Sequence, residues 1–393
     1  MKRWIVIGVM ALAVVIFGFS LIDVASNGDI QASAVLSGGV SSGGTTGFAR
    51  AIEAREWSFP QDFGAHPAFQ TEWWYYTGNL RSAEGRRFGY QFTLFRRALT
   101  PEAASVPDES EWRTNQLYMV HFALSDIEGG QFYHEERFSR GAADLAGAVV
   151  DPVYRTWLED WQVVGLNADA SERRITAQMG QHPVGIDFTT QQIRPPALQG
   201  SALNGLSAKS AEPGNASYYY SLTRMPTSGT ITIDGTAYTV DGTSWMDHEF
   251  STSALDAAAQ GWDWFGLQFD DGRDLMIGQI RYTDSAQQSF FGGLLVEADG
   301  STRYLPSETI TITPTGTWTS PHTGAVYPAG WDITIALSDG DPLHFTVTPQ
   351  MADQELNGGG IVYWEGSVML GGDVTGVGYT ELTGYAASMT GRF

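Results

Sequence analysis

Two carboxylates and a histidine stand between large apolar residues in a single short stretch, Ser244-Trp245-Met246-Asp247-His248-Glu249-Phe250-Ser251. Successive side chains of a β-strand point to opposite faces. On a strand, Asp247 and Glu249 would therefore share one face with Trp245. His248 would lie on the other face. Ionisable groups among aromatic rings either satisfy each other structurally or have shifted pKa values that serve chemistry.

Two further aromatic segments carry carboxylates, Glu72-Trp73-Trp74-Tyr75-Tyr76 upstream and Trp262-Asp263-Trp264 downstream. A wall of indole and phenol rings raises the pKa of a carboxyl group by desolvation and keeps it protonated as an acid. The ring faces can also stabilise a developing cation. Together with the central stretch, these segments predict acid–base chemistry from Asp247, His248, Glu249, Glu72 and Asp263.

A structural role is the alternative for the same groups. Arginines could bridge them at the seam between two β units, and the carboxylates would then be consumed in ion pairs. The candidate partners are Arg96, Arg97, Arg224 and Arg281. The sequence leaves both interpretations open.

Other catalytic motifs find no support. The segment Gly39–Gly43 matches the nucleophile-elbow pattern, but it lies in a Gly/Ser-rich stretch with no strand before it and no helix after it. Neither lysine, Lys2 or Lys209, follows glycine in the pattern of a phosphate loop. The seven histidines include no pair spaced two or four residues apart, so we expect no metal site and no cofactor.

The charge of the chain limits its partners. Its 393 residues include 44 acidic and 22 basic side chains, which give a formal net charge of -22. A nucleic-acid groove or electrostatic docking on anionic lipid needs basic surface, so we expect neither. Because the chain has no cysteine, it has no disulfide framework, thiolate site or cysteine-linked lipid. Its length is sufficient for two domains.

The N-terminus has the features of an export segment. Lys2-Arg3 precede an uncharged apolar run from Trp4 to Ile22 that is long enough to span a bilayer. We therefore expect residues 1–34 to be either a signal peptide cleaved after Ala32-Ser33-Ala34 or an uncleaved membrane anchor. Because the positive charges precede the run, the rest of the chain is expected outside the cytoplasm. Residues 35–49 read as a Gly/Ser-rich linker.

The rest of the chain has the pattern of an all-β protein. Phe88, Tyr90, Phe92 and Leu94 recur at every second position, which is the period of a half-buried strand. Asp234-Gly235 between two short strand patterns predicts a tight type I′ hairpin turn. Many short strands with scarcely any helix predict a sandwich or a barrel.

A weak internal repeat suggests two similar units. Each copy has an aromatic-rich strand, a glycine turn and a second strand that ends in arginine. The first copy extends from Trp74 to Arg96 and the second from Trp264 to Arg281. This pattern predicts two β domains, residues 50–225 and 226–393.

Several aromatic motifs occur in one order and cover about residues 55–390. They are Thr71-Glu72-Trp73-Trp74-Tyr75-Tyr76-Thr77-Gly78-Asn79-Leu80, Tyr218–Arg224, Trp245–Ser251, Trp262-Asp263-Trp264, Tyr363-Trp364-Glu365-Gly366 and Gly378–Tyr385. As a set they resemble the CrtC/AttH family of lipocalin-like proteins, which includes carotenoid 1,2-hydratases and secreted proteins labelled predicted hydrolases. The export segment and linker are more similar to the secreted AttH-type branch than to a carotenoid enzyme.

The resemblance implies an all-β fold of two lipocalin-like β-barrel domains side by side, with a ligand pocket near their junction. It also implies cofactor-free chemistry on apolar, often isoprenoid or polyene, molecules. The catalytic residues expected from it are Asp247, His248 and Glu72. The expected contacts with the substrate are Trp74, Tyr76, Trp245, Glu249, Trp262 and Trp264.

The leading hypothesis is an extracytoplasmic protein (periplasmic, cell-envelope or secreted) that binds a hydrophobic molecule and hydrates or isomerises it. Asp247 would protonate a carbon–carbon double bond, and Trp245 and Trp264 would stabilise the cation. His248 or Glu72 would orient or deprotonate the attacking water. The alternatives are a non-catalytic lipid carrier or accessory protein of an envelope ABC transporter, and a secreted hydrolase that uses a carboxylate-activated water.

Overall fold

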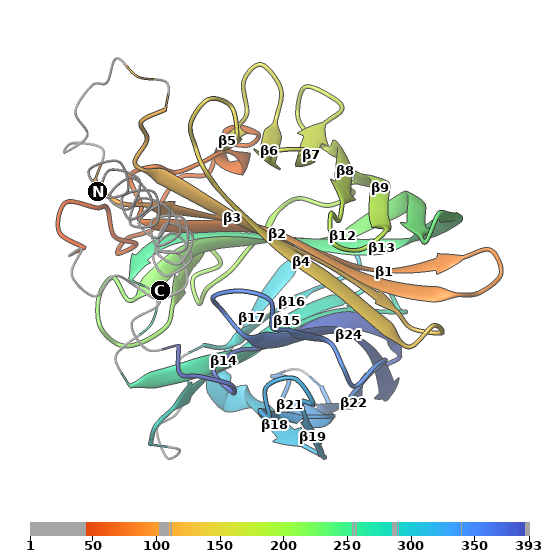
Figure 1. Cartoon of the computed structure of the whole chain (residues 1–393). Helices are drawn as coiled ribbons and strands as arrows, with labels where there is room; N and C mark the ends of the chain where they lie inside the picture. The colour runs from red at the N-terminus through yellow and green to blue at the C-terminus, as the bar shows by residue number, and fades with distance from the viewer. Residues whose placement is uncertain are drawn as a thin grey trace, which may run out of the picture.

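Two β-sheets, each curled into a nearly closed barrel, lie side by side in the computed structural model (Figure 1). This arrangement confirms the predicted all-β fold of two barrels. The structure describes residues 45–389, apart from residues 102–109, 111, 254, 256, 257, 285–288, 290 and 339. The predicted export segment and residues 35–44 of the linker lie outside the described residues. Among those described, no helix combines the length and the apolar character needed to cross a bilayer.

The first sheet starts with a four-stranded meander and ends with two long strands. Its strands are β1 (Thr71–Ser82), β2 (Arg87–Ala98), β3 (Gln116–Asp126), β4 (Gln131–Arg140), β5 (Ala146–Val149), β6 (Arg155–Leu158), β7 (Trp161–Gly165), β8 (Glu172–Gln178), β9 (Val184–Gln191), β10 (Ala197–Leu198), β11 (Leu206–Ala208), β12 (Ala216–Ile233) and β13 (Thr236–Ser253). Their spatial order is β4-β3-β2-β1-β13-β12-β9-β8-β7-β6-β5, and β10 and β11 pair with β12 off this path. A 3-10 turn, η1 (Gln61–Phe63), precedes β1.

The second sheet repeats this plan with shorter strands. Its strands are β14 (Ala259–Phe269), β15 (Asp274–Tyr282), β16 (Gly293–Val296), β17 (Thr302–Leu305), β18 (Ile310–Pro314), β21 (Trp331–Ile335), β22 (Leu343–Pro349), β23 (Glu355–Leu356), β24 (Tyr363–Gly372) and β25 (Gly376–Leu382). Their order is β17-β16-β15-β14-β25-β24-β22-β21-β18, with β23 on β24. The turn η3 (Ser307–Thr309) precedes β18, and β19 (Thr317–Thr319) and β20 (Val326–Pro328) form a separate hairpin.

The matching strand order explains the internal repeat in the sequence. In the second sheet, β14 to β17 take the places of β1 to β4, and β25 and β24 take those of β13 and β12. The chain passes from one sheet to the other between Ser253 and Ala259. The predicted domain boundary at residue 225 instead falls within β12, which pairs with β9 and β13 through Ile233 and so belongs wholly to the first sheet.

Residues with positive φ angles form the turns of two hairpins, and the first of these turns was predicted from the sequence. Asp234 and Gly235 have φ angles of 50° and 77°, the left-handed values that a type I′ turn requires, and they join β12 to β13. Residues 155–165 form a second hairpin. Glu159, with a φ angle of 57°, begins a turn that divides this segment into β6 and β7.

Each barrel has its own filled core. On β1, Trp74 and Tyr76 are fully buried and point into the first barrel. Trp73 and Tyr75, which alternate with them, point toward the second barrel. The second core is built around residues such as Trp331, which is also fully buried. Because both interiors are filled, space for a ligand must be sought between the barrels.

Candidate functional site

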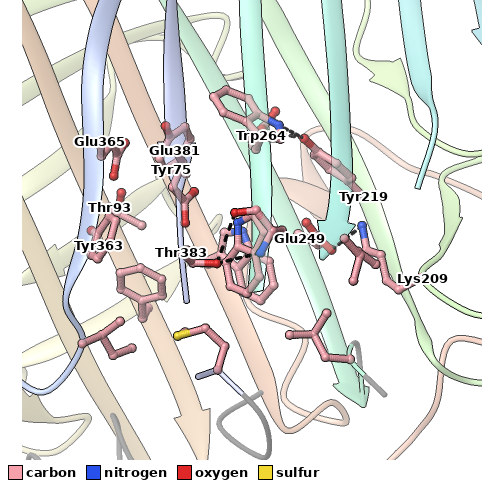
Figure 2. Close-up of a pocket in the computed structure, with 18 of the residues that line it drawn as sticks. Tyr75, Thr93, Lys209, Tyr219, Glu249, Trp264, Tyr363, Glu365, Glu381 and Thr383 are labelled. Carbon is pink, nitrogen blue, oxygen red and sulfur yellow. Dashed lines mark hydrogen bonds and ion pairs between the residues drawn. The ribbon is translucent and has the colours of Figure 1, made fainter. Parts of the chain in front are cut away.

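A cavity of about 100 Å³ lies where the outer faces of the two sheets meet. Strands β1, β2, β3, β12 and β13 line it from the first barrel, and β14, β15, β24 and β25 line it from the second. Its wall is mostly aromatic and apolar (Figure 2). Among the lining residues, the carboxyl groups are Asp247, Glu249, Glu365 and Glu381, and the lysine is Lys209.

The carboxyl group of Asp247 is buried at this cavity and accepts three hydrogen bonds. Its Oδ1 accepts from Nε1 of Trp245 at 2.7 Å and from the hydroxyl of Ser221 at 2.5 Å. Its Oδ2 accepts from the hydroxyl of Tyr219 at 2.6 Å. Oδ2 therefore keeps a lone pair for a ligand. No arginine or lysine in the described part of the chain forms an ion pair with Asp247.

Both hydroxyl donors are oriented by groups behind them. Nε1 of Trp264 donates to the Tyr219 hydroxyl at 3.1 Å. Nε2 of Gln199 donates to the Ser221 hydroxyl at 2.8 Å, so both hydroxyl protons are directed at Asp247. Burial raises the pKa of Asp247 to about 7, although the hydrogen bonds act to lower it. Asp247 can therefore both give and take a proton near neutral pH.

The second carboxyl group of β13, Glu249, is paired with a lysine. Nζ of Lys209 lies 3.1 Å from Oε1 of Glu249 and donates to the hydroxyl of Ser207 at 3.0 Å. It also lies 4.1 Å from the ring centre of Phe291. Lys209 therefore neutralises Glu249 inside an aromatic wall, and Figure 2 shows the pair on the opposite side of the view from Glu365 and Glu381.

Two carboxyl groups of the second barrel face each other across neighbouring strands. Glu365 on β24 and Glu381 on β25 are directly opposite in the strand register; Glu365 is buried and Glu381 is partly buried. Burial, together with charge on Glu381, raises the pKa of Glu365 well above its usual range. Burial also raises the pKa of Glu381 to about 8. Both groups therefore hold their protons near neutral pH.

A chain of hydrogen bonds leads from the cavity toward the surface. Nε2 of Gln91 donates to the hydroxyl of Tyr363 at 3.2 Å. That hydroxyl lies 2.6 Å from Nδ1 of His121, whose Nε2 lies 2.6 Å from Oε2 of the partly exposed Glu136. In the tautomer of His121 that carries its proton on Nε2, Tyr363 donates to Nδ1 and His121 donates to Glu136. The chain offers a route for proton exchange between cavity and solvent.

His248 on β13 and Glu72 on β1 point away from the cavity, into the first barrel. Oε1 of Glu72 lies 2.8 Å from Nε2 of His248 and 2.7 Å from Nδ1 of His66. Nε of Arg96 donates to the other oxygen of Glu72 at 2.8 Å. Although burial acts to raise it, the Arg96 charge and the histidines hold the pKa of Glu72 well below its usual range. Burial lowers the pKa of His248 to about 4.

His66, Glu72 and His248 are also the one set of three potential metal ligands that lie close together among the described residues. The ligand atoms of His66, Glu72 and His248 lie within 4.8 Å of one another, and they are of the type that binds zinc or iron. Both imidazoles, however, already bond one oxygen of Glu72, and the guanidinium of Arg96 holds the other. A divalent cation would be repelled by that guanidinium. The arrangement is that of a buried hydrogen-bond network with a structural role, and it does not fit a metal centre.

The predicted substrate contacts divide between the cavity and the first core. Trp74 donates through Nε1 to the carbonyl of Phe63 at 2.8 Å, and the hydroxyl of Tyr76 lies 3.0 Å from that of Tyr154. Trp74 and Tyr76 therefore pack inside the barrel and do not line the cavity. Trp245 lies behind Asp247 and supports it. The predicted contacts that line the cavity are Glu249, Trp262 and Trp264.

Asp263 points into the second barrel. It accepts from Nε of Arg281 at 3.0 Å, from Nε2 of Gln279 at 2.8 Å and from the hydroxyl of Tyr385 at 3.0 Å. Burial raises its pKa, against the charge of Arg281. The ion-pair interpretation thus describes Asp263 and Glu72, whereas Asp247 has no such partner among the described residues.

The sequence model of the AttH-like family matches residues 50–385. The chain belongs to the AttH-like family. Among solved structures, a protein from Nitrosomonas europaea that is described as an AttH is 36% identical in sequence to this chain. The two structures have a TM-score of 0.75, and the match covers 86% of this chain and 99% of that one. None of the curated proteins matches the chain.

Two more distant structures share the fold of this AttH-like protein. Kievitone hydratase from Nectria haematococca is 15% identical, with a TM-score of 0.61, and the match covers 86% of this chain and 99% of that one. CghA with Sch210972 is 12% identical, with a TM-score of 0.52, and the match covers 88% of this chain and 98% of that one. At these identities the likeness concerns the fold alone.

Several residues of the AttH-like cavity were not expected from the sequence. They are Lys209, Tyr219, Glu365, Glu381 and the His121–Tyr363 pair. For Glu365 and Glu381 a signal existed, because Glu365 follows Trp364 and Glu381 lies two residues after Tyr379, an aromatic context similar to the one that singled out Asp247. Lys209 had only its rarity as a signal, and the position of His121 depends on a partner 242 residues away.

Proposed function

We propose that this AttH-like protein binds an apolar, alkene-bearing molecule between its barrels and hydrates or isomerises it by cofactor-independent acid–base catalysis. The observation that carries the proposal is the buried carboxyl of Asp247, held by three neutral donors at the wall of an aromatic cavity. A buried carboxyl group with a purely structural role is expected to have a cationic partner, as Glu72 and Asp263 do.

In the first step, Asp247 donates its proton from Oδ2 to one carbon of the double bond. The π electrons form the new C–H bond, and the neighbouring carbon becomes a cation. The ring faces of Trp262 and Trp264, which line the cavity, supply the electron density that stabilises this charge. Because the walls exclude bulk water, the negative charge left on the Asp247 carboxylate also stabilises the cation more strongly than it would in water.

In the second step, the carboxylate of Asp247 takes a proton back. In a hydration, water forms a C–O bond with the cation and gives its proton to Asp247. In an isomerisation, the cation loses a proton from a neighbouring carbon to the same group. His248 and Glu72 are separated from the cavity by the strands that carry them, so this scheme gives them a structural role.

The test begins with the apolar molecules that copurify with the full-length chain, identified by mass spectrometry. Incubation in water labelled with heavy oxygen should add a labelled hydroxyl to an alkene among them, or incubation in heavy water should place deuterium beside a shifted double bond. Asp247→Asn should slow product formation by about a hundredfold or more, the usual scale for a general acid.

The matched control is Asp241→Asn, the same exchange at an exposed position of the same strand. It should leave product formation unchanged. Normal turnover in a folded Asp247→Asn variant would refute the mechanism. Retention of the copurified molecules without any product in the wild-type chain would favour a carrier or an accessory role beside an envelope ABC transporter.

We further propose that the two barrels lie outside the cytoplasm. Lys2-Arg3 followed by the apolar run from Trp4 to Ile22 support this location. Reporter fusions made after Arg50 should be active only outside the cytoplasm. A fusion that is active solely inside would rule the location out.

A further inference from the structure

Glu365 is a buried carboxyl group with unused hydrogen-bonding capacity. It is 1% exposed and lines the cavity, and neither of its oxygens makes a hydrogen bond within the described chain. The hydroxyls of Tyr75 and Tyr363 lie close enough to lower its pKa, but not in hydrogen-bonding geometry, and the Tyr75 hydroxyl is itself without a partner among the described residues. Such buried polar atoms are rare, and each costs about 1–3 kcal/mol.

The fold also places a like-charged neighbour beside this group. Glu381 is directly opposite Glu365 on the next strand, an arrangement that destabilises a sheet when both carry charge. A pair of this kind at the seam between two barrels indicates that the two residues serve a purpose other than stabilising the fold. Figure 2 shows Glu365, Glu381 and Tyr75 grouped on one side of the cavity.

The lining residues include more acidic than basic groups. Four of them are carboxyl groups, and the one lysine, Lys209, is already paired with Glu249 at 3.1 Å. Asp247 has its three neutral donors. The part of the cavity around Glu365 and Glu381 therefore presents acceptors and no cation.

The geometry does not favour a small metal ion as the cation of this site. In the described chain, the converging ligand set is the one around Glu72, and no three of the cavity carboxyl groups bring their oxygens within 4.8 Å of one another. Divalent cations require several oxygens at short distances around one point. The surrounding rings, including those of Tyr75 and Trp262, instead form the kind of aromatic wall that receives an organic ammonium group.

We infer that the cavity takes an apolar molecule with one basic nitrogen, whose ammonium group lies between Glu365 and Glu381. A primary ammonium has three N–H donors, and the two carboxyl groups and the Tyr75 hydroxyl supply three acceptors. The inference rests on the site of the proposed function and names a substrate class for it. Its test measures binding alone, so it can fail or succeed independently of turnover.

Binding of an ammonium should release a proton. Without a ligand, burial keeps both carboxyl groups protonated at neutral pH, with the pKa of Glu381 raised to about 8. When the ammonium enters, one carboxyl gives its proton to the solvent and forms a charge-assisted hydrogen bond as a carboxylate. The titratable and charged groups that face the pair from the packed strands are Tyr75 on β1, His121 on β3, Asp247 and Glu249 on β13, Tyr363 on β24, Tyr379 on β25, and Lys209.

The experiment compares geranylamine with geraniol, two probes that differ in their polar end. Each is titrated into the full-length chain by isothermal calorimetry near neutral pH, in phosphate and in Tris buffer. We expect geranylamine to bind at least about tenfold more tightly than geraniol. We also expect about one proton to be released for each geranylamine bound, seen as a difference in heat between the two buffers, and none for geraniol.

The double variant Glu365→Gln/Glu381→Gln should reduce the preference for the amine to less than about threefold and abolish the proton release, because neither amide can become a negative acceptor. Glu128→Gln, at an exposed glutamate paired with Arg87, removes the same charge outside the cavity and should change neither result. Equal affinities of the two probes for the wild-type chain, or amine binding without proton release, would overturn the inference. An unchanged preference in a folded Glu365→Gln/Glu381→Gln variant would do so as well.

Discussion

Replacing Asp247 by asparagine should remove a loss of stability that the native chain undergoes as the pH rises toward neutral. Burial raises the pKa of Asp247 from 3.8 to about 7 in the folded chain. Between these values the folded state holds a proton that the unfolded state has lost. The stability of the native chain therefore falls as the pH rises through this range. Asparagine has no such proton, so the variant escapes this loss.

The magnitude follows from the size of the shift. A rise from 3.8 to about 7 is about three pKa units, and each unit corresponds to about 1.36 kcal/mol. Relative to the variant, the free energy of unfolding of the native chain should fall by about 4 kcal/mol between about pH 4 and pH 8. The amide oxygen of asparagine can keep the donors Ser221 and Trp245, whereas its NH₂ group would face Tyr219. That change shifts the two curves by a pH-independent amount.

Urea unfolding followed by tryptophan fluorescence can measure both curves at unit steps of pH over this range. The difference between variant and native chain cancels the titration of groups that the exchange leaves unaffected. Asp241→Asn, exposed on the same strand, should give a curve parallel to that of the native chain. If the Asp247→Asn curve is parallel as well, the Asp247 carboxyl does not hold a raised pKa, and its role as the acid is refuted.

Three further predictions concern the neighbouring carboxyl groups. Glu365→Leu should raise the Tm by a few degrees in calorimetry, because it removes a buried carboxyl without a partner that costs about 1–3 kcal/mol; a lower Tm would contradict this. Lys209→Met should cost about 3–5 kcal/mol in urea unfolding by leaving Glu249 unpaired, and adding Glu249→Gln should recover much of it. Additive losses in that cycle would show that the pair does not interact. Glu72→Gln should lower the free energy of unfolding by about 3 kcal/mol while leaving the geranylamine affinity within twofold, and a large loss of affinity would place Glu72 in the site after all.

The alternation of side chains along the central strand could be predicted from the sequence. Asp247 and Glu249 share the cavity face with Trp245 beside them, and His248 lies on the other face, as the period of two requires. Which face looks into the barrel could not be predicted. Both faces of β1 and β13 are buried, one against the core of the first barrel and the other against the second barrel, so both show aromatic residues. Glu72 was placed at the cavity for that reason.

The pairing of strands that are far apart in the chain could not be predicted from the sequence either. Glu365 and Glu381 become neighbours only through the register of β24 and β25, and they meet Asp247 only because β25 packs against β1. The domain boundary was missed for a related reason. The internal repeat put the boundary at residue 225, but β12 continues past that residue and keeps its pairing with β13.

Because the cavity is walled by the outer faces of two barrels, its size depends on the angle between two rigid bodies. Rotating one barrel against the other would strain seam contacts such as the hydrogen bond from Asn79 to the Gly378 carbonyl and the ion pair of Arg194 with Asp274. It would break no ladder hydrogen bond within either sheet. We therefore expect ligand exchange without local unfolding, and we expect that longer ligands could be accommodated by exchanging a few seam residues while both cores are left intact.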